Sequence, residues 1–229
     1  MSYAPIRRLV RQFLLENQRN NSQFWAWFGD SVLRNPDGSP MRMYHGTKGV
    51  FSAFRASKIG KYGPGIYLSG SPLEASGYAT GVHRNSPVEG SGGSVMPLYV
   101  RMVNPLTLLM QPDGSYQLMT RNGTLSPAHK ELAEKLMTVR SAVETTSSQD
   151  FTRQVRDMGH DGVIVDISGA IDPAELQGLD PDTVIEDLLQ QAKYLEVVVF
   201  DPRQIKSATG NVGTWSPEEE DITLEEDDG

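Results

Sequence analysis

Four side chains are suited to chemistry by type and position, and they lie in two distant parts of the chain. His45 ends a short apolar run, Tyr67 lies in a second short apolar run, and Tyr78 follows on a predicted short helix. A histidine and a tyrosine on two strand ends suggest a cleft for a flat ligand, because aromatic faces supply stacking area. The carboxylate that such a cleft lacks is best supplied by Glu196, far downstream at the start of a valine-rich run.

Small residues surround these positions. Gly46 and Thr47 directly follow the histidine, and a turn that contains Gly63 and Gly65 leads into the run that holds Tyr67. Glycine removes side-chain bulk where a ligand must approach the backbone closely. We therefore expect the two apolar runs to border one ligand-binding cleft.

Other interpretations of the charged and titratable residues remain open at this point. The continuous valines of the run 195–200 predict a strand that is buried on both faces. Glu196, at its beginning, is then either at an exposed rim or held in a pocket, and the strand alone does not decide between them. His160 lies in the turn before a short buried strand, 162–166, and we interpret it as structural.

The composition excludes several classes of site. The chain has 229 residues, which fits one domain with appendages. It has no cysteine, which rules out disulfides, thiolate zinc sites and cysteine nucleophiles. The four histidines are scattered, so we expect no metal site. We find neither a signal peptide nor an apolar run of the roughly 18 residues needed to span a membrane, and we expect a cytoplasmic protein.

The net charge of −8 is concentrated at the carboxyl end. Of the 29 acidic residues, eight lie in 216–229, which leaves 21 acidic against 21 basic residues in 1–215. A neutral body argues against a general nucleic-acid binder, which should carry a basic stripe. The tail is either a disordered, solubilising end or a segment that folds back on the arginines of the amino-terminal helix and screens an acceptor surface.

The pattern of apolar residues predicts three parts. Residues 1–22 form an amphipathic helix and linker, 23–215 form the main domain with a helical insertion at about 170–193, and 216–229 form the acidic, disordered tail. The aromatic run 24–28 is expected to plug the core, with a ligand-facing platform as the alternative. Residues 83–93 are either a mobile cover for the cleft or plain surface. Within the main domain we expect strands at 96–102, 106–110, 116–119, 162–166 and 195–200, and helices from 127 and over 149–158.

Taken together, the segments around His45, Tyr67 and Glu196 resemble the H-Y-E class of ADP-ribosyltransferases, the diphtheria-toxin-like class that includes the catalytic domains of poly-ADP-ribose polymerases. The resemblance is closest to the ADP-ribosyltransferase domains of phage and mobile-element polyvalent proteins, and it covers roughly residues 24–215. The shared phrases are Trp-Phe-Gly-Asp-Ser (27–31), Gly-x-Pro (38–40), Tyr-His-Gly-Thr (44–47), Gly-x-Asp-Gly-Val-Ile (159–164) and Phe-Asp-Pro-x-Gln-Ile-Lys-Ser (200–207).

The resemblance implies an α+β fold in which two small antiparallel sheets form a split, barrel-like core around an NAD cleft, with flanking helices. His45 would hydrogen-bond the adenosine ribose, and the Gly46 backbone would hold the nicotinamide carboxamide. Tyr67 and Tyr78 would stack on the nicotinamide ring, and Glu196 would hold the 2′-hydroxyl of its ribose. The catalytic set is then His45, Tyr67 and Glu196; Gly46, Thr47, Gly65 and Tyr78 complete the set that binds NAD, which is a substrate, and no metal is implied.

Two positions depart from the family patterns. Ala75 replaces the serine that polymerase-type members place three residues before the second tyrosine, so Ser71, Ser76 or a backbone group would have to substitute. Tyr194 replaces the first residue of the Glu-x-Glu or Gln-x-Glu pair of the R-S-E class, which makes guanidinium transfer by that arrangement less favoured. A long regulatory domain is also missing from the sequence, which favours transfer of a single ADP-ribose unit.

The function that this resemblance implies is mono-ADP-ribosylation of a host macromolecule by a monomeric phage or effector protein. We expect the acceptor to be a protein; a nucleic acid stays open but is not favoured, and no membrane partner is expected. The alternatives are an NAD glycohydrolase and a non-catalytic NAD-binding or virion-interaction module. The acceptor residue and the host do not follow from the sequence.

Overall fold

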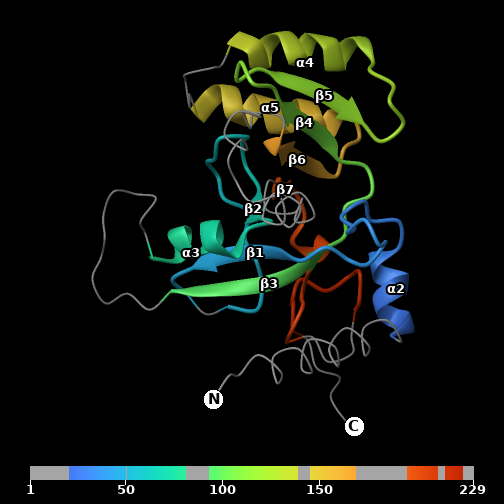
Figure 1. Ribbon diagram of the computed structural model, residues 1–229, viewed down its shortest axis with the longest axis vertical. Coiled ribbons are helices and arrows are strands. Elements are labelled where there is room, and N and C mark those ends of the chain that lie inside the picture. Colours follow the sequence, from blue (N-terminus) through green and yellow to red (C-terminus); the bar gives the residue numbers. More distant parts are fainter. Residues whose placement is uncertain are drawn as a thin grey trace, which may run out of the picture.

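The computed structural model describes residues 21–49, 51–80, 93–138, 145–168, 195–210 and 215–223 (Figure 1). The predicted amino-terminal helix, almost all of the loop 83–93 and the insertion at about 170–193 lie outside the described residues. The strands are β1 (Met43–Thr47), β2 (Ile66–Ser69), β3 (Ser94–Val100), β4 (Leu106–Met110), β5 (Tyr116–Thr120), β6 (Gly162–Asp166), β7 (Leu195–Val199) and β8 (Ile205–Ser207). The helices are α2 (Ser22–Phe28), α3 (Pro72–Thr80), α4 (Pro127–Thr138), α5 (Thr145–Asp157) and the 3₁₀ helix η4 (Pro202–Gln204).

The fold is α+β, as predicted, but the prediction of two separate antiparallel sheets is wrong. The strands form one mixed sheet that does not close, in the order β5-β4-β6-β7-β2-β1-β3-β8. β4 and β6 run parallel, and the other neighbouring strands run antiparallel. The two halves are joined because β2 pairs with β7 over four residues and also touches β1.

Of all neighbouring strands in the sheet, β1 and β2 are paired over the shortest stretch. These strands share a single residue pair, Tyr44 with Ser69, whereas β1 pairs with β3 along its whole length from Met43 to Thr47. Since the hydrogen-bonded ladder is not continued on either side of that pair, the strands can diverge there. Both His45 and Tyr67 stand next to this point.

The sheet is buried on both faces at β7, as the valine run predicts. Val197 and Val199 pack with Met43, Leu68 and other residues of the half that contains β1. Val198 points the other way and packs with the apolar residues of β4, β6, α4 and α5. Alternate side chains of a strand face opposite sides of the sheet, so three successive valines serve two cores. In Figure 1, α4 and α5 lie beside β4, β5 and β6, and α3 lies beside β1.

The aromatic run 24–28 forms α2 and supplies a third core, in agreement with the prediction that it is buried. Phe24, Trp27 and Phe28 are each at most 2% exposed and pack against Tyr99 and Trp215. The side chain of Asn21 caps the helix by accepting hydrogen bonds from two backbone amides of its first turn. None of these aromatic side chains lines the pocket described below, so the alternative of a ligand-facing platform is not favoured.

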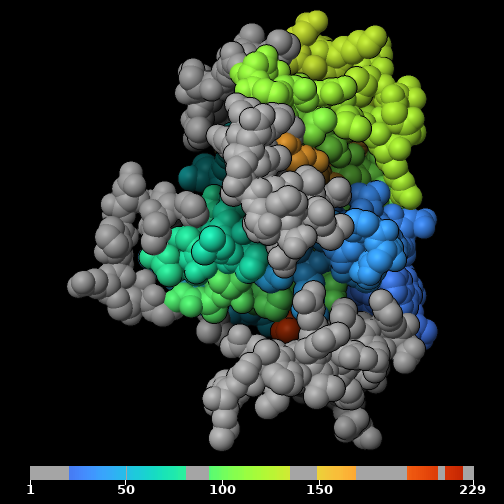
Figure 2. Space-filling model, in the orientation of Figure 1, coloured from blue at the N-terminus to red at the C-terminus, as the bar shows by residue number. Residues whose placement is uncertain are grey.

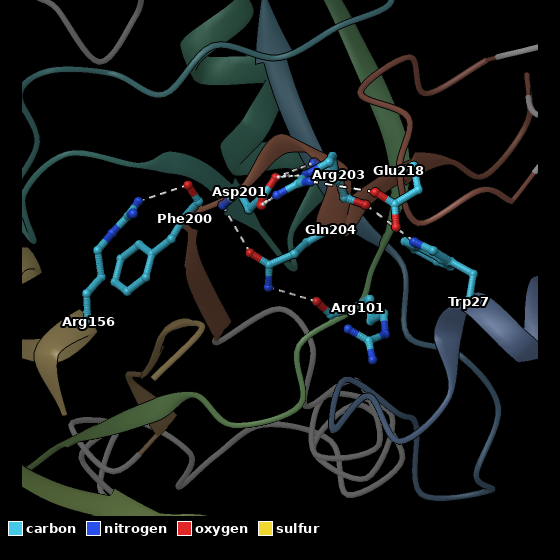
Figure 3. Close-up of polar contacts among 8 residues, drawn as sticks. All are labelled: Trp27, Arg101, Arg156, Phe200, Asp201, Arg203, Gln204 and Glu218. Carbon is cyan, nitrogen blue, oxygen red and sulfur yellow. Dashed lines mark hydrogen bonds and ion pairs between the residues drawn. The ribbon is translucent and has the colours of Figure 1, made fainter. Parts of the chain in front are cut away.

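The phrase 200–207 turns the chain sharply from β7 into β8 (Figure 3). Asp201 caps η4, and Gln204 completes a reciprocal capping box by accepting from the backbone amide of Asp201 at 3.0 Å. Gln204 also donates to the carbonyl of Arg101, and Arg156 donates to the carbonyl of Phe200 while its guanidinium lies over the Phe200 ring. This phrase therefore has a structural explanation that needs no ligand.

Part of the segment expected to be an acidic tail packs on the body. Lys206 is fully buried, and its ammonium donates to the carbonyls of Glu219 and Asp221 at 2.7 and 3.3 Å. Ile222 is also fully buried, and its backbone bonds Ser52 on one side and Ser207 on the other. Residues 224–229 lie outside the described part of the chain. Within the described residues, no helix has the length and apolar character needed to cross a membrane.

Candidate active site

A pocket of about 1140 Å³ opens where β1 and β2 diverge. Its walls come from these two strands, the loop that joins them, α3 and the start of β7. This volume lies slightly above the usual range for small-molecule sites, which suits a ligand of dinucleotide size. The pocket is lined by every site residue predicted from the sequence, namely His45, Gly46, Thr47, Gly65, Tyr67, Tyr78 and Glu196.

Two of the glycines are required by packing between backbone segments. A Cβ atom on Gly46 would lie 1.7 Å from the carbonyl oxygen of Ala75, so only glycine lets β1 approach α3. A Cβ atom on Gly65 would lie 2.3 Å from a methyl group of Val198. The sequence suggested that these glycines make room for a ligand, and the structure shows that they first make room for the neighbouring element. Their contacts with NAD stay predictions.

His45 is held in one orientation and is electrically neutral. Its Nδ1 lies 2.9 Å from the carbonyl oxygen of Tyr67, which can only accept, so Nδ1 carries the proton and Nε2 is the acceptor. The ring also meets the edge of Phe54, at a centroid distance of 5.0 Å. Burial lowers the pKa of His45 and outweighs the raising effect of the Tyr67 carbonyl. A neutral imidazole with an acceptor nitrogen is suited to a hydroxyl group of a ligand.

Tyr67 is fixed through its hydroxyl group. That hydroxyl donates to the carbonyl of Gly63 at 2.7 Å and accepts from the backbone amide of Tyr62 at 3.0 Å. Gly60 must be a glycine because a Cβ atom there would lie 2.2 Å from the same oxygen. Burial raises the pKa of Tyr67, so the phenol stays protonated. With its hydroxyl engaged by the turn, Tyr67 has its ring face available for a ligand and no hydroxyl available for proton transfer.

Glu196 provides the carboxylate of the pocket. It stands on β7 between Ser69 of β2 and Val165 of β6. Burial raises its pKa to about 7, the neighbouring carboxylate of Glu74 adds to this rise, and Lys61 opposes it. Near neutral pH this side chain therefore exchanges its proton readily. A strongly perturbed carboxyl group in a cleft is the kind of group that functional sites contain.

Three polar pocket residues near Glu196, namely Ser69, Glu74 and Lys61, were not identified as site residues from the sequence. Glu74 reaches the pocket from the first turn of α3, and the hydroxyl of Ser69 donates to its Oε2. The backbone amide of Ser71 in turn donates to the hydroxyl oxygen of Ser69 at 3.0 Å. The Ser-x-x-Glu spacing of 71–74 is a capping-box signal that could have drawn attention to Glu74. Lys61 is exposed and also lines the pocket.

The structure also explains the departure at position 75. Ala75 is 1% exposed, and its carbonyl oxygen faces Gly46. Ser69 lines the pocket, whereas Ser71 and Ser76 do not. Ser69 is therefore the hydroxyl that the pocket offers in this region. Among the described residues, no cluster of three or more acidic or histidine side chains could hold a metal ion.

Comparison with known families agrees with this site. A family model described as ADP-ribosyltransferase in polyvalent proteins matches residues 35–215, which include the whole pocket lining. The chain belongs to this family of ADP-ribosyltransferases, and the resemblance inferred from its motifs is confirmed. No curated protein and no solved structure shows significant similarity to it.

Proposed function

We propose that the protein is an NAD-dependent mono-ADP-ribosyltransferase that uses this pocket to bind NAD⁺ and releases nicotinamide. The proposal rests mainly on one observation: Glu196, a half-buried carboxylate with a raised pKa, and His45, a neutral and oriented imidazole, line the same pocket in a member of this family. A non-catalytic binding module is less favoured because both groups are present.

In this proposal each side chain contacts a particular part of NAD⁺. Nε2 of His45 accepts a hydrogen bond from the adenosine ribose, and the backbone of Gly46 holds the carboxamide. The rings of Tyr67 and Tyr78 stack on the nicotinamide, and Thr47 and Gly65 border it. Three pocket cations, Lys48, Arg55 and Lys61, lie along the loop side and suit the pyrophosphate.

The reaction breaks the bond between C1′ of the ribose and the ring nitrogen of nicotinamide. Both bonding electrons go to the ring, so nicotinamide leaves as a neutral molecule and needs no general acid. Positive charge then develops on the ribose, where the ionised carboxylate of Glu196 holds the 2′-hydroxyl and stabilises that charge. The acceptor atom forms the new bond to C1′ and loses its proton to solvent or to a pocket carboxylate.

The acceptor that we propose is a macromolecule, most simply a protein. Water as the acceptor would make the protein an NAD glycohydrolase with the same site. The neutral charge of residues 1–215 gives no support for a nucleic-acid acceptor.

The test is to incubate the purified protein with NAD⁺ labelled on its adenylate part, with and without bacterial lysate. Glu196→Gln is the site variant, and Glu134→Gln, an exposed residue of α4 outside the pocket, is the matched control. Labelled macromolecules that depend on Glu196 support the transferase, and nicotinamide release without labelling supports the glycohydrolase. If the wild type binds NAD⁺ but cleaves it no faster than Glu196→Gln, the enzymatic proposal fails.

A further inference from the structure

The pocket contains a second carboxylate whose surroundings leave it available to a ligand. Glu74 lines the pocket from α3, and Ser69, the residue that orients it, pairs directly with Glu196 across β2 and β7. The hydrogen bond from Ser69 uses Oε2 of Glu74. Among the described residues, Oε1 of Glu74 has no hydrogen-bond partner and no cation forms an ion pair with the group.

The positive and negative charges that line the pocket come from different elements. Lys48, Arg55 and Lys61 belong to the loop between β1 and β2, whereas Glu74 and Glu196 belong to α3 and β7. The exposed residues Leu73 and Tyr78 show that α3 lies at the surface, as Figure 2 also shows for this helix. We call the cations of the loop the basic wall of the pocket and the carboxylates of α3 and β7 its acidic wall; Lys61 of the loop also lowers the pKa of Glu196.

NAD⁺ has a matching division of charge. Its pyrophosphate is anionic and its nicotinamide ring is cationic, whereas the ring of NADH is neutral and the rest of the molecule has the same charge. During cleavage the positive charge moves from the ring to the adjoining ribose, so it stays close to the same wall. A counter-ion at that wall favours the oxidised ligand and follows its charge through the reaction.

We propose that Glu74 is a specificity-determining residue that, together with Glu196, forms a two-carboxylate site for the positively charged nicotinamide ring and so selects NAD⁺ over NADH. This inference rests on the proposed function. Glu74 acts on the charge of the ligand, and the capping contact with Ser69 keeps its carboxylate directed at the pocket.

Because Glu196 has a pKa of about 7, the preference for NAD⁺ over NADH should depend on pH near neutrality. The charged or titratable groups around Glu196 are Glu74 and Tyr78 of α3, Tyr67 of β2, and Lys61 and Tyr62 of the loop. Burial raises the pKa values of the three tyrosines, so they stay neutral near pH 7. A bound cation lowers the pKa of Glu196 from about 7, so binding of the cation releases protons and strengthens as the pH rises from 6 to 8.

The experiment measures the affinity of two dinucleotides by titration calorimetry. Carba-NAD⁺, in which a methylene group replaces the ring oxygen of the nicotinamide ribose, keeps the positive ring but is not cleaved, and NADH is the neutral comparison. In Glu74→Gln we expect affinity for carba-NAD⁺ to fall about fivefold to tenfold, the size of a partly solvated charge interaction, with less than about a twofold change for NADH. Glutamine still accepts the hydrogen bond from Ser69, so α3 keeps its capping contact.

Two controls separate charge from structure. Glu74→Asp keeps the charge and should restore most of the preference, and Glu134→Gln removes a charge outside the pocket and should leave both affinities unchanged. The proton release on binding of carba-NAD⁺ should move to lower pH in Glu74→Gln, because Glu196 loses the neighbour that raises its pKa. If Glu74 had only a structural role, the pH at which binding of carba-NAD⁺ releases protons would be the same in Glu74→Gln as in the wild type.

The outcomes are distinct for the two proposals. If the wild type binds neither dinucleotide, the proposed NAD-dependent function fails and the inference fails with it. If the wild type binds carba-NAD⁺ but Glu74→Gln weakens both ligands equally, or changes neither, the function stands and the role of Glu74 is overturned.

Discussion

Two histidine sites, one buried and one half-buried, show how the surroundings of a histidine distinguish a structural role from a functional one. His129 and His160 are each 7% exposed, and their Nε2 atoms lie 2.8 Å apart. The backbone amide of Ser126 donates to Nδ1 of His129, and Nδ1 of His160 donates to the carbonyl of Asn104. All four ring nitrogens of this pair are engaged. In His45, Nδ1 is engaged, and Nε2 has no hydrogen-bond partner among the described residues.

Charged groups inside and outside the pocket show the same contrast. Lys206, which does not line the pocket, is fully buried and donates to two carbonyls of the carboxy-terminal segment. Glu196 and Glu74, in the pocket, keep carboxylate oxygens that the fold does not fully satisfy. Buried polar groups that are fully hydrogen-bonded hold the fold together, and those that are partly bonded remain available to a ligand.

The largest effect that we predict concerns the packed carboxy-terminal segment. Deleting residues 216–229 removes the buried side chain of Ile222 and both carbonyl partners of Lys206, so the free energy of unfolding should fall by about 4 kcal/mol. Urea denaturation measures this. Deleting only 224–229 is the control and should change stability little. Equal stability of the wild type and both truncated proteins would show that the segment does not hold the fold.

The histidine pair should matter for stability and little for ligand binding. His160→Ala leaves Nε2 of His129 without its partner and removes one of the two hydrogen bonds to the carbonyl of Asn104, which should cost about 2 kcal/mol in unfolding free energy. Affinity for NAD⁺, measured well below the melting temperature, should not change. A large loss of affinity in a folded His160→Ala protein would remove the distinction between the two histidine sites.

His45 should show the opposite behaviour. His45→Ala removes the acceptor proposed for the adenosine ribose, so the rate of nicotinamide release at low NAD⁺ concentration should fall about tenfold, which is the cost of about one hydrogen bond. The melting temperature should fall only slightly, since one ring nitrogen of His45 contributes to the fold. Unchanged kcat/KM would mean that the open nitrogen has no part in binding.

Glu196 should lower the stability of the fold at high pH. Folding raises its pKa to about 7, so the ionised form is disfavoured in the folded state; the cost is present above about pH 7 and disappears as the pH falls toward the ordinary value for glutamate. Glu196→Gln should therefore be more stable than the wild type by about 1 kcal/mol at pH 8, after allowance for partial exposure, and equally stable at pH 4. Equal stability at both pH values would show that Glu196 is well solvated.

The local elements and the motif residues could be predicted from the sequence, but the connectivity of the sheet could not. The valine run, the aromatic helix and the structural role of His160 follow from periodicity and composition, and the structure agrees with them. The single sheet depends on β2, only four residues long, pairing with both β7 and β1. Such long-range register leaves no local pattern, so the expectation of two sheets rested on the family resemblance alone.

The parts of the site that the sequence missed share this long-range origin. Glu74 and Ser69 lie close in sequence, but their relation to Glu196 arises only from the pairing of β2 with β7. The packing of 215–223 was hidden by its acidic composition, because it is held through backbone carbonyls, which charge patterns do not reveal. The sequence also does not reveal that His160 pairs with His129, because His129 lies in the first turn of another helix, α4.

The most direct test of the account is the initial rate of nicotinamide release from NAD⁺ by the wild type, Glu196→Gln and Glu134→Gln at pH 8. We expect Glu196→Gln to be slower by about 10²-fold to 10³-fold, the usual cost of losing one group that stabilises the transition-state charge, and Glu134→Gln to equal the wild type. Equal rates for all three folded proteins would contradict the assignment of this pocket as the site of NAD⁺ cleavage.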